Sequence, residues 1–203
     1  MKIFCIAANY RRHNVEIGME EEPEPVFFMK PETSLLRNHN DFYIPDFSRR
    51  IEYETEIVVR ICKMGKSIDR KFASRYYDAV TVGLDITARD IQALSRSKGL
   101  PWFVSKGFDS SAPLGDFVSK SEFHNLGDID FGLSINGEPV QQGNTKDMIY
   151  DFDTLVSHIS KYVTLKTGDL IYTGTPAGVG PLKIGDHLVA DIEGRPLLEI
   201  KVK

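Results

Sequence analysis

The sequence predicts a β-rich α+β fold, because strand and hairpin patterns outnumber helical ones along its 203 residues. Asn136-Gly137 separates two strand-like segments, and an Asn-Gly pair supplies the left-handed residues that a two-residue hairpin turn requires. Glu193-Gly194 separates two further apolar segments and suggests a second hairpin. A chain of this length is within the range of one large domain, so we expect residues 1–203 to form a single catalytic domain.

The amino-terminal part alternates between predicted strands and polar segments. Residues 2–8 have the pattern of a strand, and residues 26–30 have that of another, which Pro31 closes. Between them lie a polar segment and an acidic stretch that contains prolines. This composition fits a mobile lid, which we place at about residues 9–25, or an ordinary surface loop.

Two acidic side chains share one face of the next predicted strand, residues 53–61. Residues two apart in an extended segment project to the same side about 7 Å apart, so Glu54 and Glu56 can converge on one cation. The opposite face is β-branched or aromatic, as a core-facing side is. Asp85 follows at the end of another apolar segment. These acids indicate either a site for a hard metal ion or a solvated acidic strand face.

Two segments carry helical signals. Thr87 and Asp90 fit a capping box, which predicts a helix that runs to about Ser97 and ends before Gly99. Asp151 is the predicted N-cap of a second helix, whose apolar residues recur at helical spacing and form a core-facing stripe: Phe152, Leu155, Val156, Ile159 and Val163.

Charge and composition exclude several classes of protein. The net charge is −4 and the sequence pI is about 5.8, so no basic stripe is available to bind nucleic acid. No apolar run approaches the ~20 residues of a membrane-spanning helix, so we expect no membrane partner. Cys5 and Cys62 lie in apolar runs and are predicted to be reduced core residues. We therefore expect a soluble cytoplasmic protein.

Residues 173–181 form a glycine-rich run without the lysine of a nucleotide-binding loop. Its threonine hydroxyls and backbone amides can hold an anionic oxygen, and a tight connection between strands is the alternative. The sequence has no Gly-x-Ser-x-Gly elbow and no histidine pair with zinc spacing. Four histidines lie in unrelated contexts and are predicted to be non-functional: His39, His124, His158 and His187.

Six motifs occur in an order that resembles the fumarylacetoacetate hydrolase family. They are Asn9-Tyr10 with His13 and Glu16, Phe28-Met29-Lys30-Pro31, Tyr53-Glu54-Thr55-Glu56, Leu84-Asp85-Ile86-Thr87-Ala88-Arg89-Asp90, Lys106, and Thr173-Gly174-Thr175-Pro176. The resemblance is closest to the short single-domain acylpyruvate hydrolase and oxaloacetate decarboxylase type. It implies a mixed β-roll of the kind found in the family's C-terminal domain, and a homodimer.

The resemblance also implies a divalent metal ion held by Glu54, Glu56 and Asp85. Three carboxylates and no thiolate make a hard oxygen site, which suits Mg²⁺ or Mn²⁺, with Ca²⁺ as a possible substitute. Cationic side chains from other motifs can offset the excess negative charge: Lys30, Arg89 and Lys106.

The implied chemistry acts on a small 2-oxo acid. We expect a divalent-metal-dependent hydrolase that cleaves the C–C bond of acylpyruvate-type 2,4-dioxo acids through a metal-stabilised pyruvate enolate. His13 is the expected general base that activates water, and Glu16 would orient its ring from the same helical turn. Lys106 completes the catalytic set, and the expected substrate-binding residues are Lys30, Arg89, Gln92 and Thr175.

Other functions remain open at this point. An oxaloacetate decarboxylase, or a 2-hydroxy-dienoate isomerase or tautomerase, would use the same site. The pair of His13 and Glu16 favours hydrolysis, because decarboxylation needs no attacking water. A non-catalytic protein that binds 2-oxo acids is the alternative from another class.

Overall fold

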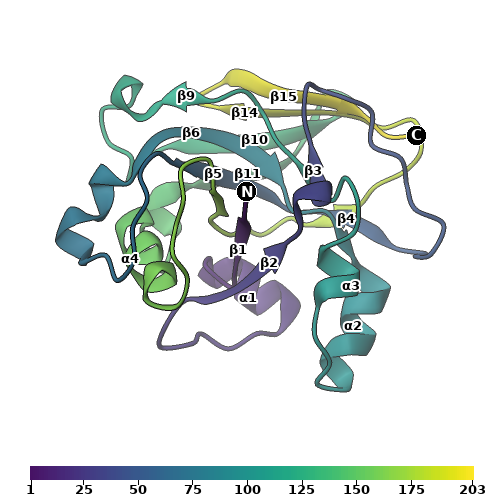
Figure 1. Cartoon of the computed structure of the whole chain (residues 1–203). Helices are drawn as coiled ribbons and strands as arrows, with labels where there is room; N and C mark the ends of the chain where they lie inside the picture. Colours follow the sequence, from purple (N-terminus) through teal and green to yellow (C-terminus); the bar gives the residue numbers. More distant parts are fainter.

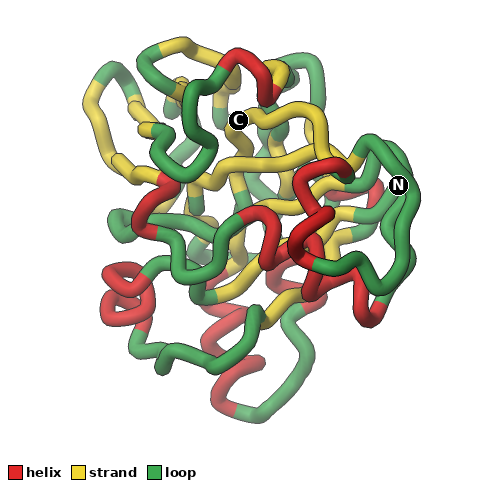
Figure 2. Tube along the Cα trace, turned by 90° about the vertical axis from the view of Figure 1, so that its left-hand side faces the viewer, coloured by secondary structure: helices red, strands yellow, loops and turns green.

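Strands form most of the regular structure, and the largest sheet joins segments from both ends of the chain. The computed structural model describes residues 1–203 (Figures 1 and 2). The largest sheet has six strands in the order β2-β1-β12-β5-β6-β9. Because β1 runs parallel to β12 and the other neighbours are antiparallel, the sheet is mixed. The strands are β1 (Ile3–Ala7), β2 (Val26–Lys30), β5 (Thr55–Ile61), β6 (Tyr77–Leu84), β9 (Val118–Ser119) and β12 (Leu170–Tyr172).

A second sheet of four antiparallel strands contains both predicted hairpins. Its order is β11-β10-β14-β15, with β10 (Asp130–Ile135), β11 (Glu138–Asn144), β14 (His187–Ile192) and β15 (Arg195–Lys201). Asn136 and Gly137 join β10 to β11, and Glu193 and Gly194 join β14 to β15. All four turn residues have positive φ, between 52° and 86°, as a type I′ turn requires. Both hairpin predictions are confirmed.

Two short sheets and four helices complete the fold. The short sheets are β13-β4-β7, with β4 (Ile51–Tyr53), β7 (Thr87–Ala88) and β13 (Gly180–Pro181), and β3-β8, with β3 (Leu35–Leu36) and β8 (Ala112–Pro113). The α-helices are α1 (Arg11–Ile17), α2 (Arg89–Ser97), α3 (Phe103–Lys106) and α4 (Phe152–Tyr162). Short 3₁₀ helices are η1 (Glu32–Ser34), η2 (Arg70–Arg75), η3 (Lys120–Glu122) and η4 (Thr145–Asp147). In Figure 1, α2 and α3 stand together at the lower right, on the opposite side from α4.

The main hydrophobic core takes residues from both larger sheets and from α4. Ile57 and Val59 of β5, Leu133 of β10 and Leu155 of α4 belong to it, and all are at most 1% exposed. The other face of β5 is covered as well, because Val58 packs into a second cluster with residues of β1 and β12. Two covered faces explain why β5 is mostly apolar after Glu56.

The structure corrects two predictions about local boundaries. Thr87 does not cap α2, which begins at Arg89 and has no side-chain cap, because Thr87 lies in β7 and pairs with Glu52. Asp90 does not reach back to Thr87 but accepts hydrogen bonds from Ser48 and from the Arg49 amide. The strand predicted over residues 53–61 is also interrupted, because β4 ends before Glu54 and β5 begins after it.

The structure also tests the predictions for the second helix cap and for the two cysteines. The N-cap prediction for the second helix is confirmed, because the Asp151 carboxylate accepts a 2.8 Å hydrogen bond from the Thr154 amide. Both cysteines are free thiols, and Cys5 is buried, but Cys62 is only half-buried and so is not the core residue that was predicted. No helix combines the length and the apolar character needed to cross a membrane.

Asn9 connects three segments that surround the site. Its side-chain amide donates to the carbonyl oxygens of Thr173 at 2.7 Å and Tyr150 at 3.1 Å, and its oxygen accepts from the Tyr150 amide at 2.8 Å. Asn9 is fully buried, so no water competes for these groups. It follows Ala8, whose φ of 58° turns the chain from β1 into α1. Asn9 therefore fixes the entry to α1 against the glycine-rich run.

We expect Asn9→Ala to lower the free energy of unfolding by about 2–4 kcal/mol, because it leaves several buried backbone groups without partners. Urea unfolding followed by circular dichroism measures the change. Asn40→Ala is the matched control: Asn40 is exposed and its side chain makes no hydrogen bond, so its effect should stay within about 0.5 kcal/mol. Equal stabilities of the two variants would contradict this account of Asn9.

Candidate active site

Three buried carboxylates meet where β5 and β6 pair. Glu54 precedes β5, Glu56 lies in β5 opposite Gly83, and Asp85 directly follows β6. The Asp85 amide donates to the Glu54 carbonyl at 2.8 Å, which aligns the two chain segments. One ligand oxygen from each carboxylate lies within 4.8 Å of the others, and no residue of the three is more than 5% exposed. The structure thus brings together the three residues that were predicted to bind a metal.

The donor set and its surroundings fit a divalent cation. Carboxylate oxygens are the ligands that Mg²⁺ and Mn²⁺ prefer. Asp85 Oδ1 is buried and accepts no well-directed hydrogen bond, and the Lys30 ammonium lies 2.8 Å from it. Burial raises the pKa of Glu56, as do the negative charges of Asp85 and Glu54, although a 2.7 Å hydrogen bond from the Gly174 amide lowers it. A cation among the three oxygens would supply the attraction that Glu56 lacks.

Lys106 lies beside this cluster at the carboxyl end of α3. Its ammonium donates to Glu54 Oε2 at 2.7 Å, to Asp85 Oδ2 at 2.9 Å and to Thr87 Oγ1 at 2.6 Å. Burial lowers the pKa of Lys106, but the charges of Asp85 and Glu54 outweigh burial and raise it overall. Lys106 is therefore a fixed positive charge in the cavity wall, and its predicted catalytic role stays a prediction.

Lys30 lies behind Asp85 rather than in the cavity wall. Its ammonium is 2.8 Å from Asp85 Oδ1, off the direction of a hydrogen bond. It donates to the Ser111 carbonyl at 2.7 Å and the Ser111 hydroxyl at 3.0 Å, and makes a longer 3.3 Å contact to the Ile86 carbonyl. In this structure Lys30 holds Asp85 in place, and its predicted contact with substrate stays a prediction.

Arg89 connects α2 to the strand that carries the acids. Its guanidinium donates to Glu52 Oε2 at 2.6 Å, Glu54 Oε1 at 2.5 Å and Gln92 Oε1 at 2.5 Å. Burial alone would raise the pKa of Glu54, but Lys106 and Arg89 outweigh it and hold this pKa well below its usual range. Sequence reasoning missed Glu52, although it continues the alternation of Glu54 and Glu56 by one further step.

His13 and Glu16 form the contact that was predicted for them. His13 Nδ1 lies 3.0 Å from Glu16 Oε2 on α1, which leaves Nε2 of His13 without a protein partner. The Gly178 amide donates to the Glu16 carboxylate at 3.1 Å. The glycine-rich run therefore binds anionic oxygens through its amides, as predicted, and in this structure the anions are Glu56 and Glu16. Gly174 and Gly178 have φ of 99° and 105°, which a residue with a side chain rarely adopts.

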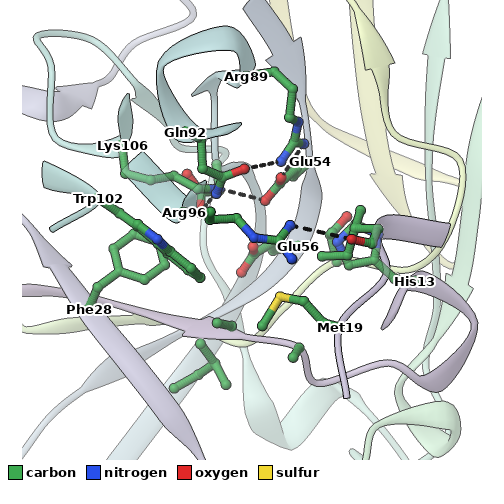
Figure 3. Close-up of a pocket in the computed structure, with 16 residues that line it drawn as sticks. His13, Met19, Phe28, Glu54, Glu56, Arg89, Gln92, Arg96, Trp102 and Lys106 are labelled. Carbon is green, nitrogen blue, oxygen red and sulfur yellow. Dashed lines mark hydrogen bonds and ion pairs between the residues drawn. The ribbon is translucent and has the colours of Figure 1, made fainter. Parts of the chain in front are cut away.

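A cavity of about 30 Å³ opens over the carboxylates (Figure 3). Every predicted site residue lines it except Glu16 and Lys30. The Thr175 hydroxyl borders it and accepts a 3.0 Å hydrogen bond from Gln141. Two further lining residues were not predicted: Arg96 lies in the last turn of α2, and Trp102 directly precedes α3.

Comparison with known proteins reveals close relatives of the whole chain. A family profile described as "Fumarylacetoacetate (FAA) hydrolase C-terminal" matches residues 2–203. A mitochondrial oxaloacetate decarboxylase from Dictyostelium discoideum is 42% identical over 194 residues, which are 95% of this chain and 89% of the relative. An oxaloacetate tautomerase from Escherichia coli is 39% identical over 199 residues, which are 97% of this chain and 90% of the relative.

A solved structure agrees with the sequence comparison. The crystal structure of a fumarylpyruvate hydrolase from Pseudomonas aeruginosa in complex with Mn²⁺ and pyruvate aligns with a TM-score of 0.94. The alignment covers 100% of this chain and 89% of that one, at 32% sequence identity. The predicted fold class is thus confirmed, and the chain is a metal-site enzyme of the fumarylacetoacetate hydrolase family, with the strand-rich mixed fold of that family's C-terminal domain.

Proposed function

We propose that this protein acts on oxaloacetate, which it decarboxylates and interconverts between keto and enol forms. The observation that carries the proposal is the group of three buried carboxylates, open to a cavity and flanked by the fixed charge of Lys106. Two relatives that span nearly the whole chain, at 42% and 39% identity, are named for oxaloacetate decarboxylation and tautomerisation. Both reactions develop an enolate across carbons 2 and 3, that of pyruvate in decarboxylation and that of oxaloacetate in tautomerisation, so one site that stabilises such a charge can perform both.

Glu54, Glu56 and Asp85 would hold Mg²⁺, or Mn²⁺ in its place, with Ca²⁺ as a possible substitute. When bound, such an ion supplies a Lewis acid that stabilises the developing negative charge of an enolate. The Mn²⁺ in the fumarylpyruvate hydrolase structure supports this choice of cofactor.

The chain's own residues would bind and orient the 2-oxo acid. Lys106 already uses its three N–H donors on Glu54, Asp85 and Thr87, so it would attract an anionic substrate oxygen through its fixed positive charge. Gln92 uses its side-chain oxygen for Arg89, so its amide nitrogen remains available as a donor to substrate. The Thr175 hydroxyl accepts from Gln141 and donates only a long 3.4 Å hydrogen bond to the Pro176 carbonyl, so it can turn its hydrogen toward a carboxylate. Phe28 and Trp102, with ring centroids 6.0 Å apart, provide an apolar wall.

His13 is the residue that would move a proton. Tautomerisation removes a proton from carbon 3 and returns one to the 2-oxo oxygen. His13 lines the cavity, and because its Nδ1 faces Glu16, its Nε2 is the nitrogen free to carry that proton. Decarboxylation breaks the bond between carbons 3 and 4 and needs no base to start it.

Hydrolysis of acylpyruvates is the second candidate function. The pair of His13 and Glu16 supports it, because an oriented histidine is a suitable base for an attacking water. The similarity to the fumarylpyruvate hydrolase supports it as well. A non-catalytic 2-oxo acid binding protein is the third alternative, and it predicts binding without turnover.

The first prediction concerns the metal site. Glu56→Gln and Asp85→Asn should each weaken Mn²⁺ binding by at least about 100-fold, because each removes a charged ligand while keeping the side-chain volume. Titration calorimetry measures the affinity, and circular dichroism confirms the fold. Glu138→Gln is the matched control, since Glu138 is exposed on β11 and far from the predicted ligands in sequence. Unchanged Mn²⁺ affinity in both site variants would contradict the assignment of Glu56 and Asp85 as metal ligands.

The second prediction separates the candidate reactions. The wild type should turn over oxaloacetate with Mg²⁺ and lose this activity with a chelator. His13→Ala should slow tautomerisation, and any acylpyruvate hydrolysis, by about 10²- to 10⁴-fold, the usual contribution of a positioned acid or base. Oxaloacetate decarboxylation should fall much less.

The measurements are the steady-state rates of oxaloacetate tautomerisation, of oxaloacetate decarboxylation, and of fumarylpyruvate and acetylpyruvate hydrolysis. His124→Ala is the control at an exposed histidine. Absence of oxaloacetate turnover in the wild type would overturn the proposed function. Equal losses of all three reactions in His13→Ala would instead show that His13 binds substrate and does not transfer protons.

The third prediction is the homodimer that the family resemblance implies. Closed two-fold dimers are the commonest assemblies of soluble proteins. Light scattering at micromolar concentration should give twice the chain mass of 22.9 kDa. A species of single-chain mass at every concentration tested would contradict it.

A further inference from the structure

Arg96 is a cavity-lining cation without a carboxylate partner. It extends from the last turn of α2 toward α1 (Figure 3), where one nitrogen of its guanidinium donates a long 3.3 Å hydrogen bond to the Ile17 carbonyl. No acidic group lies within ion-pair distance of it. A guanidinium has five N–H donors, so most of those of Arg96 are available to a ligand.

We propose that Arg96 binds the second carboxylate of a dicarboxylic 2-oxo acid and so gives the site its preference for dicarboxylates over monocarboxylates. This inference rests on the proposed function, because it assumes that the first carboxylate and the 2-oxo group bind beside Glu54, Glu56 and Asp85. A guanidinium suits the task, since it meets a carboxylate through two parallel hydrogen bonds.

The other arginine and lysine of the cavity are already committed. Arg89 donates to two glutamates and Gln92, and Lys106 donates to Glu54 and Asp85. Their positive charges therefore neutralise carboxylates of the protein. Arg96 is the cavity-lining arginine or lysine whose charge remains for a carboxylate that arrives with the substrate.

The net charge of the site also favours Arg96 as the group that binds a second carboxylate. Four buried carboxylates face three cations, which leaves one net negative charge: Glu52, Glu54, Glu56 and Asp85 against Lys30, Arg89 and Lys106. Arg50 also contacts Glu52, but its side chain is 64% exposed and solvent screens it. A divalent ion changes the balance to one positive charge, which a monocarboxylate neutralises. A dicarboxylate brings one further negative charge, and Arg96 can offset it.

The exposure of Arg96 and the lining of the cavity suit a charged group that remains partly in contact with solvent. The carboxylates and Lys106 are buried, whereas Arg96 is exposed. Apolar residues line the space near Arg96: Ile17, Met19 and Trp102. An uncharged lining favours a ligand with its two charged groups at its ends, which is the structure of oxaloacetate.

The test compares ligands that differ by the second carboxylate alone. Malate and lactate lack the 2-oxo group and so cannot decarboxylate, and malate equals lactate with one added carboxylate. Titration calorimetry of Mn²⁺-loaded protein should show that Arg96→Gln weakens malate binding by about 10- to 100-fold, the loss expected for a charge-assisted hydrogen-bonded pair. Lactate binding should not change. Arg96→Lys, which keeps the charge but not the paired donors, should fall between the wild type and Arg96→Gln for malate.

Lys98→Gln is the matched control for loss of a positive charge at the same helix end. Lys98 is exposed, does not line the cavity, and its side chain makes no hydrogen bond or ion pair, so malate binding should stay as in the wild type. In turnover, Arg96→Gln should raise the KM for oxaloacetate by the same factor as it weakens malate binding, while the inhibition constant of pyruvate should not change.

Two results would overturn the role of Arg96: wild-type malate affinity in Arg96→Gln, or an equal loss of malate and lactate affinity. These results are distinct from failure of the proposed function, which would appear as a wild-type protein that does not turn over oxaloacetate. The comparison of malate with lactate decides the role of Arg96 in that case too.

Discussion

The structure of the site depends on a buried network of opposite charges that no single element could hold. Lys30 comes from β2, Arg89 from α2 and Lys106 from α3, and each contacts a carboxylate on or beside β4, β5 or β6. Burying such charges is costly unless each has a partner, and removal of one partner typically costs about 3–5 kcal/mol. The network therefore fixes the relative positions of these elements, and it does so where an enzyme needs rigid geometry.

This network also explains how α2 and α3 attach to the rest of the fold. Their buried residues are mainly polar: Gln92, Ser95, Ser105 and Lys106. Hydrophobic burial thus contributes less to their attachment than it does for α4, whose Phe152, Leu155 and Ile159 belong to the main core. The helices that supply the cavity wall are held by the site itself, so a change in the charge of the site will be transmitted to their position.

The sequence predicted best those features that depend on neighbouring residues. Asn136-Gly137 and the Asp151 cap are local, and the alternation of Glu54 and Glu56 follows from strand geometry. The capping box failed because a non-local contact prevailed: the Thr87 hydroxyl accepts from Lys106, and the Thr87 backbone pairs with β4. Glu52 and Arg96 were missed for the same reason. Glu52 contacts Arg89 and Arg96 contacts Ile17, and only the fold brings these partners near.

The parallel pairing of β1 with β12 has a consequence for biosynthesis. Ile3 pairs with Leu170, and β12 lies between β1 and β5 in the sheet. When the ribosome releases β1 and β5, the strand that joins them has not yet been made, and at about 5–20 residues per second it follows only after several seconds. During this interval two apolar strands have unpaired edges. Such edges attract other nascent chains, so the protein is expected to need a chaperone until its last third has emerged.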